Sequence, residues 1–369
     1  MTIDTEKSYG VYVHIPFCKA KCKYCAFVST PDFSLQKAYV DTLVKEINDS
    51  TYKGGVVDTV YIGGGTPSCL FRGGLADIMR AVRSSFRVTD GAEITVECNP
   101  ESVSADFVAE CKDSGVNRIS MGLQSSCDNV LRAIGRVHTY ADYVNAVELL
   151  ARSFDNISSD IILGLPEQTS ADVINGITTV ARYCSHLSVY ALTVEYGTLL
   201  YNSGYAPSDD DIADLYDLAY AKLVELGFSR YEVSNFARGG RESKHNNKYW
   251  ECLPYIGFGV AAHGYDGART RFMHCDDIGK YIACSTVESY ALTDKDLYNE
   301  YVMLRLRTER GISTDGFYKR FGYDFCEYNA EVLDRLKKDK LIVFADGAVR
   351  IAPDKMFVMN SVIEQLMLD

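Results

Sequence analysis

From residue 9 to about residue 235 the chain alternates β-rich apolar segments with segments of helical periodicity. The predicted strands include "YGVYVHIPF", "VVDTVYIGGG" and "AEITVECNP", and a helical pattern follows each of them. Strands joined by helices of this length need right-handed crossovers and form a parallel sheet. Six or seven such units, the last ending in "YEVSNF", therefore predict an α/β fold with a complete or partial (β/α) barrel.

The pattern changes after about residue 290. Helical segments such as "TDKDLYNEYVMLRLRTERGI" lead to a helix and a predicted β-hairpin in "EYNAEVLDRLKKDKLIVFADGAVRIAPD". This order predicts a small helical, winged-helix-like module. The predicted organisation is a barrel at 1–240, a connecting segment at 241–290 and the module at 291–369.

Composition restricts the class of partner. The net charge is −12, which argues against a nucleic-acid partner held through its phosphates. No segment approaches the roughly 20 apolar residues that a membrane span needs. The polar start "MTIDTEKSYG" has no apolar core of signal-peptide length. We therefore expect a cytoplasmic protein, either a monomer or a homodimer.

Three of the twelve cysteines are clustered in "FCKAKCKYCAF", as Cys18, Cys22 and Cys25, and Phe27 occupies the next candidate ligand position. The other nine are scattered singly, as small buried side chains would be. A structural zinc ion takes four ligands, and a redox pair would not need Cys18. A cubane iron–sulfur cluster takes one thiolate per iron, so three thiolates leave one iron open to a ligand from outside the protein.

The segment "CKAKCKYC" matches the C-x3-C-x2-C loop of the radical S-adenosylmethionine (SAM) enzymes, and "YIGGGTPS" resembles their glycine-rich turn. The resemblance implies a [4Fe–4S] cluster on the three cysteines, with SAM chelating the open iron. It also implies that Gly64, Gly65 and Thr66 hold the methionine part of SAM. A glycine-rich turn by itself is a weak signal and is often only a tight connection.

The same resemblance extends to further predicted SAM contacts, most of which follow predicted strands. These residues are Tyr12, Tyr24, Glu97, Gln124, Arg136 and Asp160. Burial of an isolated acid is costly, which favours a functional role for Glu97 and Asp160. An ordinary surface ion pair is the alternative for Arg136, and a place in the aromatic core is the alternative for Tyr12.

A narrower resemblance rests on "YVHIPFC", "RISMGLQS", "DIILGLPEQT" and "HNNKYW". These segments resemble the coproporphyrinogen-III-oxidase-like group over residues 9–369. The oxygen-independent oxidase has a fourth cysteine where this chain has Phe27. The pattern C-x3-C-x2-C-x-F is that of the HemW haem chaperone family, whose members pass haem to acceptor haemoproteins. That function is expected here, with the oxidase, another radical SAM reaction on a tetrapyrrole, or a zinc-bound or metal-free binding module as alternatives.

The segment "KHNNKYW" at 244–250 matches the HNxxYW haem-binding motif of that family. The resemblance implies haem binding through His245, Asn246, Tyr249 and Trp250. A neutral imidazole is the commonest axial ligand of haem iron, and the two aromatic rings offer flat apolar surfaces. The alternative is a polar loop with an exposed histidine. His263 in "GFGVAAHGY" is a second candidate ligand.

Overall fold

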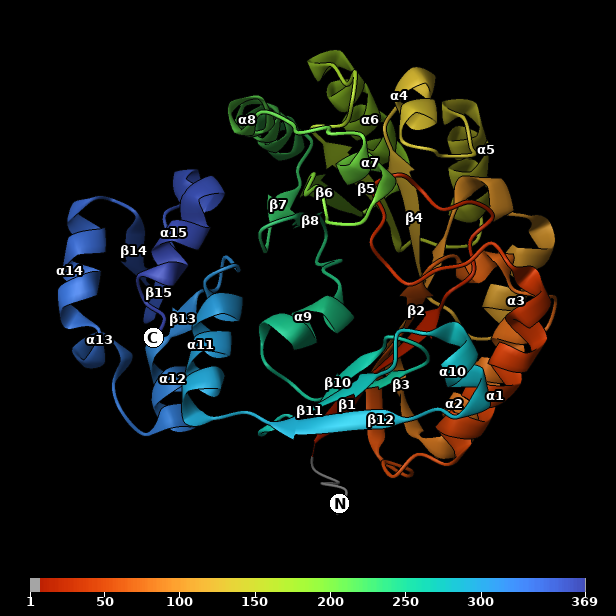
Figure 1. Ribbon diagram of the computed structural model, residues 1–369. Coiled ribbons are helices and arrows are strands. Elements are labelled where there is room, and N and C mark those ends of the chain that lie inside the picture. The colour runs from red at the N-terminus through yellow and green to blue at the C-terminus, as the bar shows by residue number, and fades with distance from the viewer. Residues whose placement is uncertain (1–6, 369) are drawn as a thin grey trace.

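The central strands of the fold are parallel. The computed structural model describes residues 7–368; residues 1–6 of the polar N-terminal segment and residue 369 lie outside the described part. Six strands lie side by side in chain order and pair in parallel. They are β1 (Ser8–Ile15), β2 (Val56–Gly64), β3 (Arg87–Cys98), β4 (Arg118–Gln124), β5 (Ile157–Leu163) and β6 (His186–Ala191). The predicted α/β fold with a partial (β/α) barrel is confirmed (Figure 1).

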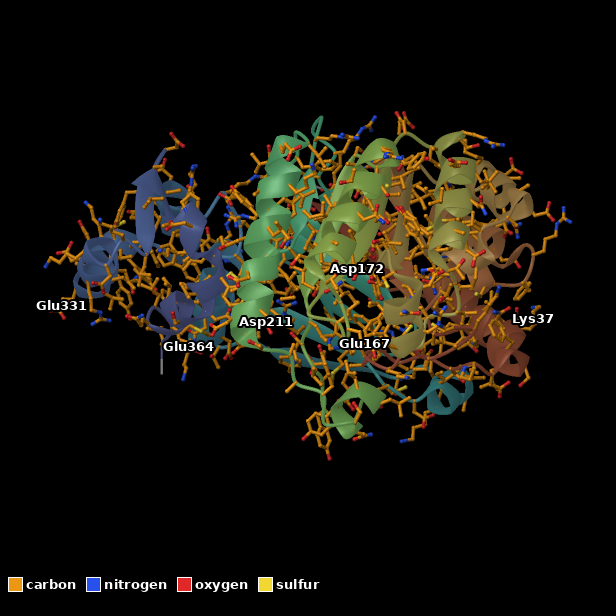
Figure 2. The ribbon with its side chains drawn as sticks, turned by 90° about the horizontal axis from the view of Figure 1, so that it is seen from above. Lys37, Glu167, Asp172, Asp211, Glu331 and Glu364 are labelled. Carbon is orange, nitrogen blue, oxygen red and sulfur yellow. The ribbon has the colours of Figure 1, made fainter. Side chains whose placement is uncertain are left out.

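Helices connect successive strands and cover the outside of the sheet. They are α1 (Gln36–Asn48), α2 (Gly74–Ser85), α3 (Ala105–Asp113), α4 (Asp128–Ala133), α5 (Tyr140–Ala151) and α6 (Ser170–Tyr183). After β6 come the short α7 (Leu199–Asn202) and the longer α8 (Asp209–Glu225). Thr139 and Thr169 begin α5 and α6 with reciprocal capping boxes. Seen from above, α6 and α8, marked by Asp172 and Asp211, run side by side (Figure 2).

The expected last parallel strand, "YEVSNF", is different in the structure. This region forms β7 (Ser229–Arg230) and β8 (Asn235–Ala237), and β8 pairs antiparallel with both β6 and β7. The prediction of a further parallel strand was therefore wrong. Only residues 231–234 separate the two strands, which is enough for a chain reversal but too short for a crossover.

Residues after β8 return to the opposite edge of the sheet. The helix α9 (Lys244–Trp250) comes first, and β9 (Tyr255–Phe258) then pairs in parallel with β1. Three antiparallel strands follow in order, β10 (His263–Tyr265), β11 (Thr270–His274) and β12 (Val287–Ala291), with α10 (Ile278–Ala283) before the last. Much of the segment predicted as a connection thus extends the large sheet. The boundaries at 240 and 290 stay a prediction.

The C-terminal part is a separate small module with its own core, which includes Phe317, Leu336 and Val349. Its helices are α11 (Asp294–Arg305), α12 (Thr314–Phe321), α13 (Phe325–Tyr328), α14 (Ala330–Lys338) and α15 (Met359–Glu364). Its antiparallel sheet has the order β13 (Ile312–Ser313), β15 (Ala348–Ile351), β14 (Ile342–Ala345). The predicted winged-helix-like module is confirmed. It lies beside the barrel, with α9 between the two in the view of Figure 1.

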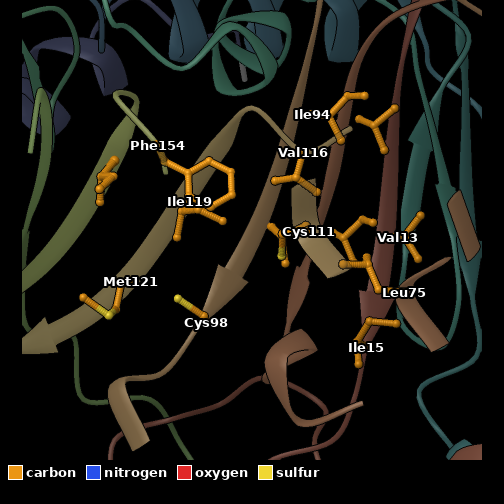
Figure 3. Close-up of a cluster of buried hydrophobic side chains, with 14 of the residues drawn as sticks. Val13, Ile15, Leu75, Ile94, Cys98, Cys111, Val116, Ile119, Met121 and Phe154 are labelled. Atoms are coloured by element: carbon orange, nitrogen blue, oxygen red, sulfur yellow. The ribbon is translucent and has the colours of Figure 1, made fainter. Parts of the chain in front are cut away.

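The two faces of the parallel strands differ in polarity. Val13, Ile15, Ile94, Ile119 and Met121 belong to the buried core between sheet and helices (Figure 3). Successive side chains along a strand point to opposite faces, so the residues between these apolar ones line the inner face of the barrel. On β3, β4 and β5 most inner residues are polar or glycine, namely Glu93, Thr95, Glu97, Arg118, Ser120, Gly122, Ser158 and Asp160. Ile162 of β5, which lines the cavity at the strand end, is apolar.

The scattered cysteines only partly match the expectation that they are buried. Cys98 and Cys111 lie in the core, as Figure 3 shows, and Cys184 and Cys252 are also buried. Four others are only partly buried, namely Cys69, Cys127, Cys275 and Cys326. Cys284 is exposed, so the expectation was wrong for that residue. It lies between α10 and β12, which is an edge strand of the sheet.

Tyr39 of α1 is a stability test of the packing around β1. Its buried hydroxyl donates to the backbone oxygen of His14 (2.8 Å) and accepts from the N–H of Val260 (3.0 Å). Tyr39→Phe leaves both groups without a partner, so it should lower the free energy of unfolding by about 1–3 kcal/mol. The thermal midpoint should fall relative to Tyr318→Phe, whose ring is 58% exposed. Equal midpoints for the two variants would contradict this.

Candidate cofactor site

The cysteine loop connects β1 to α1 and is held by backbone hydrogen bonds at several points. The N–H of Cys18 donates to Thr30 (3.1 Å), and the N–H of Lys23 donates to Ile134 (2.9 Å). The N–H of Leu200 in α7 donates to the oxygen of Lys23 (2.8 Å). All three thiols are free and partly buried. The loop therefore presents three thiols from a position that its neighbours define.

One cavity of about 560 Å³ brings the predicted cluster and SAM residues together. It lies at the carboxyl ends of the parallel strands, where this class of barrel carries its chemistry. The predicted residues that line it are Cys18, Cys22, Tyr24, Cys25, Gly64, Gly65, Glu97, Gln124, Arg136 and Asp160.

The glycine-rich turn after β2 has no room for side chains. Gly64 has φ +104°, and a Cβ placed there would collide with the His14 ring. A Cβ on Gly65 would lie 2.6 Å from the backbone oxygen of Ile15. Thr66 is buried behind the turn, where its hydroxyl donates to Cys18 Sγ (3.3 Å). The turn thus packs directly against the cysteine loop.

Two carboxyl groups and one amide present acceptor atoms in this cavity. Glu97 accepts from the Tyr61 hydroxyl (2.6 Å) and from the N–H of Gly64 (2.9 Å), and burial raises its pKa to about 7. Burial also raises the pKa of Asp160, to about 6. Asp160 Oδ1 and Gln124 Oε1 are buried without hydrogen-bond partners. Unpaired buried acceptors of this kind fit the donor groups of a polar ligand.

Arg136 is part of the cavity wall. Its guanidinium donates to Asn99 Oδ1 (2.8 Å) and to the backbone oxygen of Gly122 (3.1 Å), and it lies 3.7 Å from Cys22 Sγ. No carboxylate forms an ion pair with it among the described residues, so the surface ion pair considered above is not what the structure shows. The cation instead faces a predicted cluster ligand.

Burial disfavours the thiolate form of Cys18 and of Cys25. Burial raises the pKa of Cys18 to about 11 and also raises the pKa of Cys25. Cluster assembly would therefore release protons as the thiolates form on iron. Across residues 7–368, no group of three or more His, Cys, Asp or Glu side chains is arranged to hold a metal ion.

Asn99, Tyr190 and Tyr61 are site residues that sequence reasoning missed. Asn99 donates to Thr66 Oγ1 (2.9 Å) and accepts from Arg136, and Tyr190 lines the cavity from β6. Their places after or near the ends of strands were a usable signal. Tyr61, which binds Glu97, lies inside a strand among other apolar residues and carried no such signal.

The motif at 244–250 lies at the opposite end of the barrel's inner face. It forms the helix α9, whose contacts are with residues well before the carboxyl ends of β1, β2 and β3. The N–H of His245 donates to Glu93 (3.1 Å), and Lys248 pairs with Asp58 (2.7 Å) and donates to the oxygen of Ser8 (3.2 Å). The polar-loop alternative is therefore wrong, because α9 closes this end of the barrel.

His245 is fully buried, and both of its ring nitrogens have partners. Nδ1 bonds to the Thr59 hydroxyl (2.9 Å) and Nε2 to the Tyr249 hydroxyl (2.8 Å). Burial lowers the pKa of His245 to about 3, which keeps the imidazole neutral. Its ring also lies 5.3 Å from that of Tyr61. In this conformation the imidazole has no free nitrogen for a metal.

The remaining predicted residues lie around this motif or away from the cavity. Tyr12 stacks on Tyr61 (6.2 Å) and its hydroxyl bonds to His14 Nδ1 (3.0 Å), within the barrel. Asn246 is partly exposed, and Trp250 Nε1 is buried without a partner. His263 is exposed on β10, which lies between β9 and β11 in the sheet.

Comparison with known proteins identifies the family. Residues 12–177 match the radical SAM superfamily and residues 292–354 match the HemN C-terminal domain. "Heme chaperone HemW" of Bacillus subtilis is 34% identical over 96% of this chain and 97% of its own. The protein of that name from Lactococcus lactis is 32% identical over 99% of this chain and 98% of its own. This chain belongs to the HemW family.

A solved structure shows the same fold over nearly the whole chain. Coproporphyrinogen III oxidase (HemN) from Escherichia coli superposes with a TM-score of 0.85, covering 98% of this chain and 90% of that chain, at 22% sequence identity. At this identity the likeness concerns the fold alone. Across residues 7–368 no helix is long and apolar enough to cross a membrane.

Glu97 gives a pH test of the cavity. Its pKa of about 7 in the folded protein lies above the ordinary value of 4.5, so its contribution to stability is present at low pH and is lost as pH rises through 7. The thermal midpoint of the ligand-free protein, followed from pH 5 to 8.5, should fall less steeply in Glu97→Gln than in the wild type. Glu364→Gln, an exposed control, should keep the wild-type slope. Parallel curves for wild type and Glu97→Gln would contradict the prediction.

Proposed function

We propose that this protein is a haem chaperone that carries a [4Fe–4S] cluster, binds SAM and haem, and delivers haem to acceptor haemoproteins. The observation that carries the proposal is the cavity in which three cysteines meet the glycine turn and the strand-end carboxyls, with Phe27 in place of a fourth cysteine. The Phe27 side chain is 67% exposed and cannot ligate iron. The relatives named as haem chaperones support the haem part of the proposal.

The residues of the cavity suit both resident groups. Cys18, Cys22 and Cys25 would ligate three irons of a cubane, and the fourth iron would be left for SAM. The unpaired acceptors of Gln124 and Asp160 would receive donor groups of SAM. When bound, a reduced cluster supplies the electron that can cleave SAM. The protein residues supply position, charge and exclusion of water.

Haem binding through α9 would require the helix to move. His245 would have to leave the hydroxyls of Thr59 and Tyr249, and Lys248 would have to leave Asp58. We infer that the present structure is a closed state, in which the imidazole is stored inside the barrel. Opening of α9 would expose the His245 imidazole together with the aromatic rings of Tyr249 and Trp250.

The cluster assignment predicts a specific loss of iron. Cys22→Ser should remove the [4Fe–4S] content of anaerobically reconstituted protein, because a cubane with two protein thiolates is poorly held. Cys284→Ser, which changes an exposed cysteine outside the cavity, should keep iron, sulfide and the cluster absorbance of the wild type. One zinc per chain and no sulfide in the wild-type protein would overturn the cluster and leave a zinc-binding module.

The haem-ligand assignment is tested by a pair of variants around one hydrogen bond. His245→Ala removes the imidazole, and Thr59→Val removes only its Nδ1 partner. In haemin titrations followed by the Soret band, His245→Ala should weaken binding by about tenfold or more, a typical loss for a buried bond to a metal or charge. Thr59→Val should bind at least as tightly as the wild type, because its imidazole is easier to release. Equal affinities of the two variants would show that His245 is not the ligand.

A further inference from the structure

Arg118 is a buried cation without a bonding partner. It begins β4, its exposed fraction is 2%, and it is among the largest fully buried side chains of the described residues. Its Nε has no hydrogen-bond partner, and no described residue forms a hydrogen bond or an ion pair with its guanidinium. By contrast, the buried Arg230 bonds to Glu309, Tyr216 and the backbone of Pro353. An unbonded buried guanidinium is costly, which suggests a missing partner.

The sheet register places Arg118 on the inner face between the two predicted sites. Arg118 pairs with Thr95, and Ser120, two residues further along β4, pairs with Glu97 on one side and Ser158 on the other. The charge of Arg118 acts on Glu97 and Asp160 in the cavity, and also on His245 of α9. Its guanidinium therefore lies within electrostatic reach of both ends of the barrel.

The groups around Arg118 do not replace a bonded anion. Glu93 already accepts the N–H of His245, and Glu97 already accepts two hydrogen bonds from Tyr61 and Gly64. Burial raises the pKa of Glu93, Glu97 and Asp160, and that of Glu97 reaches about 7, so Glu97 carries only part of a negative charge near neutrality. Thr95 Oγ1, the cross-strand neighbour of Arg118, is also without a partner. The unpartnered guanidinium of Arg118 therefore lies next to the unpartnered hydroxyl of Thr95.

We propose that Arg118 binds a carboxylate of a ligand inside the barrel. A planar guanidinium offers a carboxylate two parallel N–H donors. Among residues 7–368, no other unpartnered side chain on this inner face is a guanidinium. Two ligands of the proposed function carry a carboxylate: haem, through its propionates, and SAM, through its methionine part. The inference therefore rests on the proposed function. It adds an anion-binding residue that lies outside the glycine turn and outside the α9 motif.

The competing explanation is that Arg118 is only a counter-charge for Glu97 and Asp160. The two roles predict opposite effects on the ligand-free protein. If Arg118 is a structural counter-charge, Arg118→Met lowers the thermal midpoint, because buried carboxylates lose their cation. If Arg118 binds a ligand and has no bonding partner in its absence, Arg118→Met raises the thermal midpoint of the ligand-free protein, because a buried charge without a partner is removed.

The experiment compares the wild type, Arg118→Met and Arg118→Lys, all cluster-loaded and full length. Affinities are measured for SAM, for haemin and for haemin dimethyl ester, which lacks free carboxylates. We expect Arg118→Met to have a higher ligand-free midpoint and about 10- to 100-fold weaker binding of one carboxylate ligand, with Arg118→Lys in between. A loss for haemin that disappears with the dimethyl ester identifies a propionate, and a loss for SAM alone identifies the SAM carboxylate.

Unchanged affinities for both SAM and haemin in Arg118→Met would overturn the inference, as would a lower midpoint in the ligand-free variant. The proposed function fails separately, if wild-type protein binds no haemin. In that case the SAM measurements still decide the role of Arg118. Arg118→Lys keeps the charge but not the planar pair of donors, so its affinities separate the loss of bidentate bonding from the loss of charge.

Discussion

The constraint on which the rest of the structure depends is the polar inner face of the parallel sheet. Its outer face is apolar and is covered by helices, whereas the inner face carries Glu97, Arg118 and Asp160. Buried polar groups must find partners, so the polar side chains at each end of this inner face must be paired within the protein or reach a ligand or solvent. At the carboxyl ends of the strands these side chains line a cavity, which is the proposed cofactor site. At the opposite end these side chains are covered by the helix α9, whose His245 and Lys248 form hydrogen bonds with residues of the strands.

The two ends are connected by one aromatic residue. Tyr61 donates to Glu97 on the cavity side and lies against the His245 ring on the α9 side. A carboxyl whose pKa is near 7 accepts a different pattern of hydrogen bonds in its two protonation states. Only the side chain of Tyr61 therefore separates Glu97 from the His245 imidazole, which the proposed function must release. Tyr61 is in contact with both the cavity carboxyl and the α9 imidazole.

Several polar groups in and beside the cavity lack hydrogen-bond partners within the protein. Burial raises the pKa of the Cys18 thiol, and Gln124 and Asp160 each have a buried acceptor atom without a partner. Beside the cavity on the same inner face, Arg118 Nε also has no partner. Burial of each of these groups without a partner costs free energy in the ligand-free protein. A partner that binds these groups in the folded state alone would shift the folding equilibrium toward that state.

Sequence patterns predicted the parts of this protein that depend on local rules. The alternation of strand and helix patterns implied the parallel sheet, and parallel strands bring residues at their carboxyl ends together whatever their separation in the chain. For that reason Cys22, Gly64, Glu97 and Asp160 could be expected at one edge before any contact was known. The spacing of the cysteines likewise determined how many ligands the loop can offer. Patterns at strand ends could also have revealed Asn99.

Only the tertiary structure decided which side chains are accessible and which are paired. No pattern shows that "YEVSNF" reverses direction, because that depends on which neighbour is free to pair. No sequence pattern shows that Thr59 and Tyr249 bond to the two ring nitrogens of His245, because Thr59 lies 186 residues away in the chain. The same holds for Arg118, whose missing partner is visible only once the surrounding strands are in place. Motifs determine which chemical groups are present, and packing determines which of them are available to bind.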